Sequence, residues 1–463
     1  MSRIYIGDLS QHIGTEVEIA GWIDVRRDQG KMVFFDFRDM TGKVQGVVLP
    51  GSSAIDVAKE CRPEWVVKVT GKVNQRPEKA QQKEKLNGNI ELEVLEILVL
   101  NKAETPNFEI SSDTRVVGED SRLEYRYLDL RSERMQKNLR NRHRVTKFIR
   151  DYLDKKNFVE IETPLLTKST PEGARDYVVP SRLDTGKFYA LPQSPQQYKQ
   201  LLMTGGVEKY FQIARCMRDE DTRGDRQPEF TQLDLEMSFV KEEDVLNLVE
   251  NLLIEIVTVL YPEKKIQNIP FPRISHREAL EKYNSDRPDI RENKDDPDLL
   301  AFCWIVDFPF FEKTPEGKWT FTHNPFSAPK PEHMESLLKG EEIGTILAAQ
   351  YDIVLNGFEI GGGSIRNYNA DALTKVFVIM GHAMENIEEN FGHMLKAFRS
   401  GTPPHGGIAW GLDRLMMVLQ NESSIREVIA FPKTGEGRDL MMKSPSEIRD
   451  EQLKELGISI KKK

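Results

Sequence analysis

Apolar and polar residues alternate along short segments of the first hundred residues, and turn residues separate these segments. In the first segment, Val17, Ile19, Ile23 and Val25 would share one face of a strand, because successive side chains of a strand point to opposite sides. The same alternation predicts strands at residues 17–27, 32–39, 43–49, 64–73 and 89–100. Strands this short and this closely spaced predict a small closed β-barrel of the OB-fold type.

The pattern changes after residue 106, where a polar segment, residues 107–130, is typical of a linker or hinge. From residue 131 to residue 463, helical and strand patterns follow one another in irregular order, and residues 242–261 have the spacing of a long amphipathic helix. This order predicts an α+β domain built on an antiparallel sheet flanked by helices. No GxGxxG motif follows a strand and no P-loop motif occurs, which disfavours the two common nucleotide-binding folds.

Composition places the chain among ordinary globular proteins, with 463 residues and 39% hydrophobic residues. The three cysteines show no CxxC spacing, so neither a zinc site nor a disulfide framework is indicated, and a reducing cytoplasm fits. No apolar run reaches membrane-spanning length, and the N-terminus does not resemble a signal peptide. We therefore expect a cytoplasmic protein with no membrane partner.

The net charge of −9 argues against non-specific binding of nucleic acid but leaves room for a local basic surface. Residues 131–156 contain ten Lys or Arg against three acidic residues. Within them Val145, Phe148, Ile149 and Tyr152 follow helical spacing, so one side of this helix would pack and the other would be strongly positive. The positive side is either a solvated face or a surface that contacts phosphate.

Fixed charges of both signs crowd residues 215–236, which also carry a strand pattern. We predict a charged loop between two antiparallel strands, the second of which alternates Leu233 and Leu235 with Asp234 and Glu236. Arginines suit phosphate oxygens, and carboxylates suit a metal or an ammonium group. The loop is therefore either a solvated hairpin tip or a site for a magnesium-bound nucleoside triphosphate.

Several segments together resemble the bacterial-type aspartyl-tRNA synthetases of class II, almost from end to end. The three class II motifs would be the helix 140–157 followed by VEIETPLL, then RDEDTRGDRQPEFTQLDLE, then GIAWGLDRL. The segments TKSTPEGARDY, QSPQQYKQLL and NGFEIGGGSIR resemble the aspartate branch in particular. The resemblance implies ligation of L-aspartate to tRNA-Asp with ATP as co-substrate, and it leaves tRNA-Asn open as a second acceptor. It also implies a homodimer built on the first motif, and the apolar helix face around Phe148 and Tyr152 would support it.

The resemblance assigns the ATP site to charged residues. Arg218 would bind the α-phosphate and act as the catalytic residue that stabilises the pentavalent transition state. Glu220 would hold the adenine amino group, and Arg414 would bind the γ-phosphate. Asp352 and Glu359 would carry Mg²⁺, which neutralises the leaving pyrophosphate.

The aspartate site would combine a planar cation for the side-chain carboxylate with acceptors for the ammonium group. Arg366 would bind the carboxylate, Lys199 would add charge, and Asp234 would orient both cations. Glu172 and Gln196 would bind the ammonium group, and His323 would also belong to the aspartate site.

The barrel would read the anticodon. An aromatic ring flanked by hydrogen-bonding groups is typical of a site for an unstacked base, although core packing is the competing explanation for Phe34. The residues in question are Arg27, Phe34, Gln45 and Glu91.

The sequence departs from the family pattern in three places. Residues 281–309 leave no room for the additional domain of the bacterial family, Asn324 stands where a second histidine follows His323, and Gln29 leaves the choice between tRNA-Asp and tRNA-Asn unreadable. Two alternatives compete with a tRNA ligase. One is a paralogue that transfers activated aspartate to another acceptor such as ammonia, and the other is a non-catalytic binding protein on the same scaffold.

Overall fold

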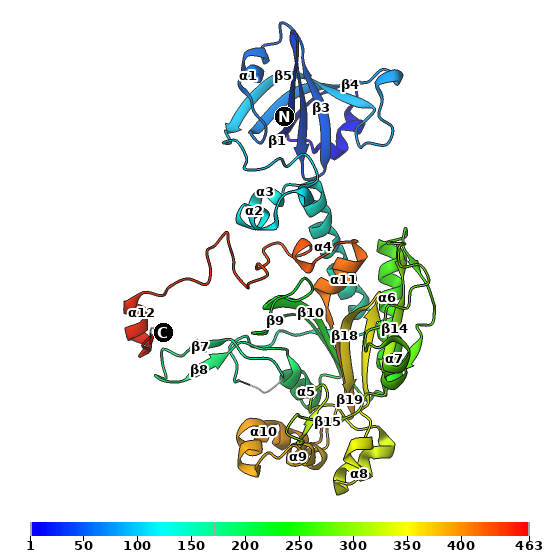
Figure 1. Cartoon of the computed structure of the whole chain (residues 1–463). Coiled ribbons are helices and arrows are strands. Elements are labelled where there is room, and N and C mark those ends of the chain that lie inside the picture. Colours follow the sequence, from blue (N-terminus) through cyan, green and yellow to red (C-terminus); the bar gives the residue numbers. More distant parts are fainter. Residues whose placement is uncertain (1, 170–172, 462–463) are drawn as a thin grey trace. The chain divides into compact units, whose positions relative to one another are not determined.

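The computed structural model describes residues 2–169 and 173–461. The chain divides into two compact units, Met1–Lys137 and Asn138–Lys463 (Figure 1). Among the described residues, no helix is long and apolar enough to cross a membrane.

The first unit contains a closed barrel with strand order β1-β2-β3-β5-β4. All its pairings are antiparallel except that of β3 with β5. The inward-facing residues of the strands form one apolar core, in which Phe35 and Phe37 stack at 5.2 Å. The predicted five-stranded barrel is therefore confirmed. Its elements are β1 (Glu16–Gln29), β2 (Met32–Asp39), β3 (Gly42–Val48), α1 (Ile55–Glu60), β4 (Val66–Gln75) and β5 (Ile90–Asn101).

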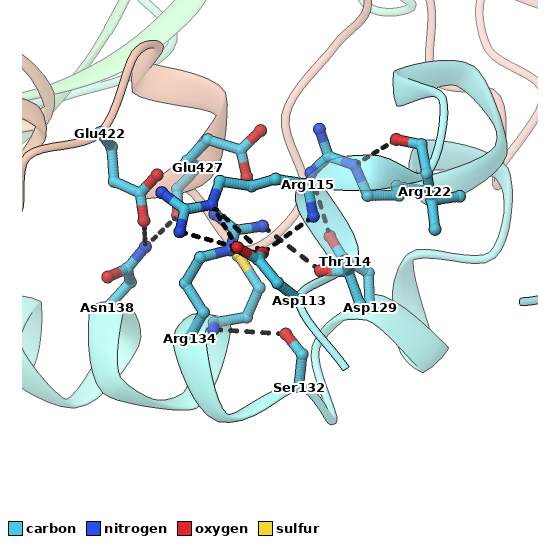
Figure 2. A network of polar contacts seen from close by, with 12 residues as sticks. Asp113, Thr114, Arg115, Arg122, Asp129, Ser132, Arg134, Asn138, Glu422 and Glu427 are labelled. Carbon is cyan, nitrogen blue, oxygen red and sulfur yellow. Dashed lines mark hydrogen bonds and ion pairs between the residues drawn. The ribbon is translucent and has the colours of Figure 1, made fainter. Parts of the chain in front are cut away.

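The segment predicted as a polar linker contains short helices, α2 (Glu119–Glu124) and α3 (Arg126–Asp129). Polar contacts order it: Thr114 Oγ1 donates to Asp129 Oδ1 at 2.6 Å, and Asp113 accepts from the backbone N–H of Arg115 at 3.0 Å (Figure 2). Helix α4 (Glu133–Asp154) begins in this unit and continues in the second.

The second unit is built on an eight-stranded sheet with the order β12-β14-β17-β18-β19-β10-β9-β6. Only the outer pairs, β12 with β14 and β6 with β9, are parallel, which confirms the predicted α+β class with a mainly antiparallel sheet. The sheet strands are β6 (Val159–Glu160), β9 (Lys209–Met217), β10 (Glu229–Ser238), β12 (Arg273–Ser275), β14 (Phe302–Val306), β17 (Gln350–Leu355), β18 (Phe358–Ile365) and β19 (His405–Gly411).

Helices cover this sheet because their apolar stripes match its apolar face (Figure 1). The main core joins the sheet to α4, α6 (Glu242–Leu260) and α11 (Leu412–Leu419), whose buried residues have essentially no exposed surface. Asn138 anchors the N-terminal part of α4 in this unit by donating to Glu422 Oε1 at 2.7 Å and to the carbonyl of Glu427 at 3.0 Å (Figure 2). The remaining helices are α5 (Gln196–Thr204), α7 (His276–Tyr283), α8 (Met334–Lys339), α9 (Ala370–Ile379), α10 (Met384–Phe398) and α12 (Asp450–Leu456).

Among the described residues of this unit, three small two-stranded sheets complete the fold. They pair β7 (Val178–Pro180) with β8 (Phe188–Ala190), β11 (Lys265–Ile266) with β13 (Leu299–Leu300), and β15 (Phe311–Lys313) with β16 (Trp319–Phe321).

The β17–β18 hairpin turns at Asn356 and Gly357, which have φ angles of 51° and 85°. Positive φ at both central residues is typical of the hairpin turn that Asn-Gly sequences favour. The hairpin sets Asp352 opposite Gly362 and Val354 opposite Glu359. The two predicted metal-binding acids therefore lie on adjacent strands of one hairpin.

Candidate active site

A cavity of about 370 Å³ lies against the sheet of the second unit, within the size range of small-molecule sites. Strands β10, β18 and β19 and the loop of residues 218–228, here called the charged loop, contribute to its wall. Most of the predicted substrate residues meet here, although they come from distant parts of the sequence. They are Gln196, Lys199, Arg218, Glu220, Asp234, His323, Glu359, Arg366 and Arg414.

Two buried acid–base pairs form one side of this cavity. Lys199 Nζ donates to Asp234 Oδ1 at 2.5 Å and lies 3.2 Å from Glu236 Oε2. Arg366 donates to Glu236 twice, from Nε at 2.9 Å and from Nη2 at 3.1 Å. The four side chains are at most 2% exposed, so solvent screens their interactions little.

The prediction that Asp234 orients both cations is therefore corrected. Asp234 pairs with Lys199, whereas Glu236 holds Arg366. The two acids are two residues apart on β10 and face the same side of the sheet. Gly407 makes room for Glu236, since a Cβ there would lie 2.2 Å from Glu236 Oε2 and 2.1 Å from a backbone oxygen of β10.

The pKa values of these two acids shift in opposite directions. Burial opposes ionisation of Glu236, but Arg366 and Lys199 outweigh it and hold the pKa of this carboxyl below its ordinary value. Burial raises the pKa of Asp234, which Lys199 offsets only in part, and Asp234 Oδ2 has no hydrogen-bond partner in the described part of the chain. Arg366 remains a firmly fixed cation, because its contact with Glu236 outweighs its burial and raises its pKa.

Two arginines lie on another part of the cavity wall. The guanidinium carbon of Arg218 lies 5.1 Å from the centre of the Phe230 ring, a cation–π contact. Arg414 donates to the carbonyl of Glu359 at 2.7 Å and to that of Asp225 at 3.2 Å, which fixes its direction. Phe230 also lines the cavity, and sequence reasoning had not singled it out.

Asp352 and Glu359 form the predicted metal-binding pair. Asp352 is buried, and burial together with Glu359 raises its pKa well above the ordinary value. Its Oδ1 accepts no hydrogen bond from any described residue. A Cβ on Gly362 would lie 2.6 Å from this oxygen, so the glycine leaves room for the carboxylate. No group of three or more His, Cys, Asp or Glu among the described residues is placed to hold a metal ion alone.

The other predicted substrate residues differ in how they are held. Gln196 Nε2 is buried without a hydrogen-bond partner among the described residues. Burial lowers the pKa of His323, so its imidazole is held in the neutral form. Asn324 also lines the cavity, and its Oδ1 accepts from the N–H of Phe326 at 2.9 Å, which shapes the turn after it. Glu172 lies outside the described residues.

The predicted anticodon residues lie in the first unit, on the barrel. Arg27 of β1 is directly opposite Phe34 of β2, and Gln45 of β3 is opposite Asp36. Phe34 is half-buried and is not among the buried core residues that include its neighbour Phe35. Glu91 is the second residue of β5, which pairs with β3. Phe34 therefore does not belong to the buried core of the barrel, and its role in anticodon binding stays a prediction.

The apolar helix face predicted to support a dimer packs inside its own chain. Tyr152 belongs to the buried core of the second unit, and Phe148 packs against that core. The next segment is different, because Val159, Leu165 and Leu166 are 52%, 46% and 53% exposed.

Two family models match the chain. The model for tRNA synthetases class II (D, K and N) matches residues 118–435, and that for an OB-fold nucleic acid binding domain matches residues 17–100. The chain is 42% identical to the aspartate--tRNA(Asp/Asn) ligase of Rubrobacter xylanophilus over 97% of this chain and 95% of that protein. It is 38% identical to the aspartate--tRNA(Asp/Asn) ligase of Bacillus subtilis over 99% and 98%. The Rubrobacter alignment runs over 576 residues, more than the 463 of this chain, so the relative has segments with no counterpart here.

Solved structures share the fold. The asparaginyl-tRNA synthetase of Pyrococcus horikoshii in complex with asparaginyl-adenylate matches with a TM-score of 0.75 at 23% identity, over 94% of this chain and 98% of that one. A putative aspartyl-tRNA synthetase of Leishmania major matches with a TM-score of 0.75 at 22% identity, over 93% and 94%. These matches confirm the predicted combination of an OB-fold barrel with a class II synthetase fold.

Proposed function

Because the chain belongs to the class II tRNA synthetases of the D, K and N group, we propose that it activates L-aspartate with ATP and transfers the aspartyl group to tRNA. An oxygen of the aspartate α-carboxylate attacks the α-phosphorus of ATP, and the bond to pyrophosphate breaks. A ribose hydroxyl at the 3′ end of the tRNA then attacks the carbonyl carbon of aspartyl-adenylate, and AMP leaves.

The observation that carries this proposal is the coexistence of two cationic regions in one cavity. Lys199 and Arg366 are buried and braced by acids, as a site for one small carboxylate requires. Arg218 and Arg414 lie on another part of the wall, where a triphosphate with its extended charge can lie between them. Neutral His323 and the unpartnered Gln196 Nε2 offer polar contacts to the rest of the amino acid.

In this proposal Arg218 is the catalytic residue, because a fixed guanidinium stabilises the charge that develops on the α-phosphate. Phe230 offers an aromatic face to the adenine base, with Glu220 as acceptor for its amino group. Arg414 binds the γ-phosphate. Glu172, directly before Gly173, would bind the substrate ammonium group.

Asp352 and Glu359 fit a magnesium ion that arrives with ATP. Carboxylate oxygens are its preferred protein ligands, and sites that use substrate phosphates need only one or two of them. Asp352 Oδ1 has no hydrogen-bond partner among the described residues, and the pKa of this acid is raised. Both features are expected of two neighbouring carboxylates whose charges no cation offsets. When bound, the ion supplies charge neutralisation to the phosphates.

The barrel is proposed to hold the anticodon through Arg27, Phe34, Gln45 and Glu91. We propose tRNA-Asp as the acceptor, and the shared name of the Rubrobacter and Bacillus relatives favours tRNA-Asn as a second one. Exposed Val159, Leu165 and Leu166 support a homodimer built on this segment. We propose a cytoplasmic location, because translation takes place there. No observation supports transfer to an acceptor such as ammonia.

Charging tests the proposal. Purified protein with ATP, Mg²⁺ and labelled aspartate should aminoacylate tRNA-Asp, and the ratio of the rates for tRNA-Asn and tRNA-Asp measures discrimination. Formation of pyrophosphate without charging of either tRNA would contradict the proposed acceptor.

A further inference from the structure

The charged loop is held from outside the cavity by residues 424–439, here called the C-terminal strap. The tip of the loop lies at Gly224, whose carbonyl accepts from Ile425 N at 3.1 Å and from Ser424 Oγ at 2.9 Å. The loop lines the cavity, whereas most of the strap does not. The strap therefore acts on the wall of the cavity from behind.

A second set of contacts fixes the base of the loop. The side chain of Gln227 pairs with the backbone of Lys433, accepting from its N–H at 2.7 Å and donating to its carbonyl at 3.2 Å. Thr222 Oγ1 donates to the carbonyl of Gly435. Gln227 is buried and lines the cavity, so the strap backbone fixes a group that faces the substrate.

The side chain of Lys433 closes the arrangement. Its ammonium group lies 3.4 Å from Glu229 Oε1, at the start of β10, and 3.3 Å from Asp439 Oδ2, in the strap itself. Asp439 is fixed in turn, because its Oδ1 accepts from Met442 N at 2.9 Å. One cation thus joins the strap to the strand that follows the loop, while the other oxygen of Glu229 accepts from Arg215 at 2.6 Å.

We propose that Lys433 is a positioning residue: through the C-terminal strap it holds the charged loop in the shape that binds ATP, without contacting ATP itself. The proposal rests on the proposed function, because the loop carries Arg218 and Glu220. Aspartate binding depends on Lys199 and Arg366, which lie on α5 and at the end of β18. Loss of the strap contact therefore affects the two substrates unequally.

The test is Lys433→Met, which keeps the aliphatic stem and removes the charge. In aspartate-dependent ATP–pyrophosphate exchange, we expect the KM for ATP to rise about tenfold, because small misplacements of binding groups are costly. The KM for aspartate should stay within about threefold, and Lys433→Arg should restore most of the ATP affinity. Trypsin should cut the variant faster after Arg223 and Arg226, in the charged loop.

Lys330→Met is the matched control. Lys330 is as exposed as Lys433, at 20%, and like Lys433 it does not line the cavity, but it pairs with Asp307, away from the charged loop and the strap. This variant should keep the wild-type KM for ATP and the wild-type rate of loop cleavage. A purely structural role for Lys433 would lower the melting temperature without raising the KM for ATP or exposing the loop.

A wild-type KM for ATP together with wild-type loop cleavage in Lys433→Met would overturn the proposal. If that variant does not fold, Thr222→Val carries the same test, since it removes one hydroxyl outside the buried core, and an unchanged KM for ATP would then overturn it. If the wild-type protein shows no aspartate-dependent exchange, the proposed function fails. Loop cleavage, which needs no activity, still decides whether Lys433 holds the loop.

Discussion

Arg366 and Glu236 meet through two hydrogen bonds, of 2.9 and 3.1 Å, in a region where both side chains are at most 2% exposed. A guanidinium held in this way cannot turn away from the cavity, because a rotation would break both hydrogen bonds at once. Glu236 thereby determines the direction of the cation that is proposed to bind the substrate carboxylate.

Glu236→Gln tests this relationship. The amide keeps the shape but leaves Arg366 as a buried charge with a weakened partner, which costs about 3–5 kcal/mol when a buried pair is broken outright. We expect kcat/KM for aspartate to fall at least about a hundredfold, which corresponds to about 3 kcal/mol, with a much smaller change in the KM for ATP. Glu243→Gln, which alters an exposed pair with Arg273, is the control and should change neither parameter. Equal losses for both substrates would argue for general damage to the site.

Arg218→Ala tests the catalytic assignment. Loss of one strong donor to a developing negative charge costs about 3 kcal/mol. ATP–pyrophosphate exchange should therefore fall by roughly two orders of magnitude, mainly in kcat. Arg277→Ala is the control, because this arginine of α7 is 88% exposed and lies away from the cavity. Exchange within fivefold of wild type in Arg218→Ala would exclude the role.

Phe34→Ala separates anticodon binding from barrel stability. Loss of one base–aromatic stack costs about 1–3 kcal/mol, so charging should fall while ATP–pyrophosphate exchange is unchanged. The neighbouring Phe35→Ala is the matched control: its ring is fully buried, and its loss should destabilise the barrel by about 3–5 kcal/mol. Melting, exchange and charging measured on both variants distinguish the two roles, and equal loss of exchange and charging in Phe34→Ala would rule out anticodon binding.

His405 predicts a pH dependence of stability. The histidine is fully buried on β19 and donates from Nδ1 to the carbonyl of Pro403 at 2.8 Å, and burial lowers its pKa below the ordinary 6.5 despite nearby Glu236. As the pH falls, the unfolded chain therefore takes up a proton at a higher pH than the folded chain does. The contribution of neutral, buried His405 to the free energy of unfolding is complete above pH 6.5 and is lost as the pH falls from 6.5 toward the folded pKa. Relative to His405→Asn, the wild type should lose up to about 1.4 kcal/mol per pH unit in this window. Denaturation at pH 8 and pH 5.5 measures the difference, and a constant difference would contradict the prediction.

The barrel could be predicted from the sequence because alternation reports directly which side of a strand is buried. The packing of Phe148 and Tyr152 could not be predicted in the same way. Their spacing indicates an apolar helix face, but such a face can pack against the core of its own chain or against a partner subunit. Only the packing of α4 decides between them.

The site shows a similar limit. Asp234 and Glu236 occupy equivalent positions on β10, and the sequence offers no way to assign each acid to a cation. Their assignment depends on where α5 and the end of β18 place Lys199 and Arg366 in space. The contact between Lys433 and the charged loop joins residues more than 200 positions apart, and no local pattern could indicate it.

The most direct test of the central claim is ATP–pyrophosphate exchange by the wild-type protein with aspartate and with asparagine. Arg366 and Lys199 have only hydrogen-bond donors to offer the substrate side chain, so they suit both oxygens of a carboxylate, whereas the NH2 group of asparagine would place a donor against these donors. We therefore predict exchange with aspartate and a kcat/KM for asparagine at least about ten-thousandfold lower, as polar sites of this kind achieve without editing. Exchange with asparagine equal to that with aspartate, or exchange with neither amino acid, would contradict the account.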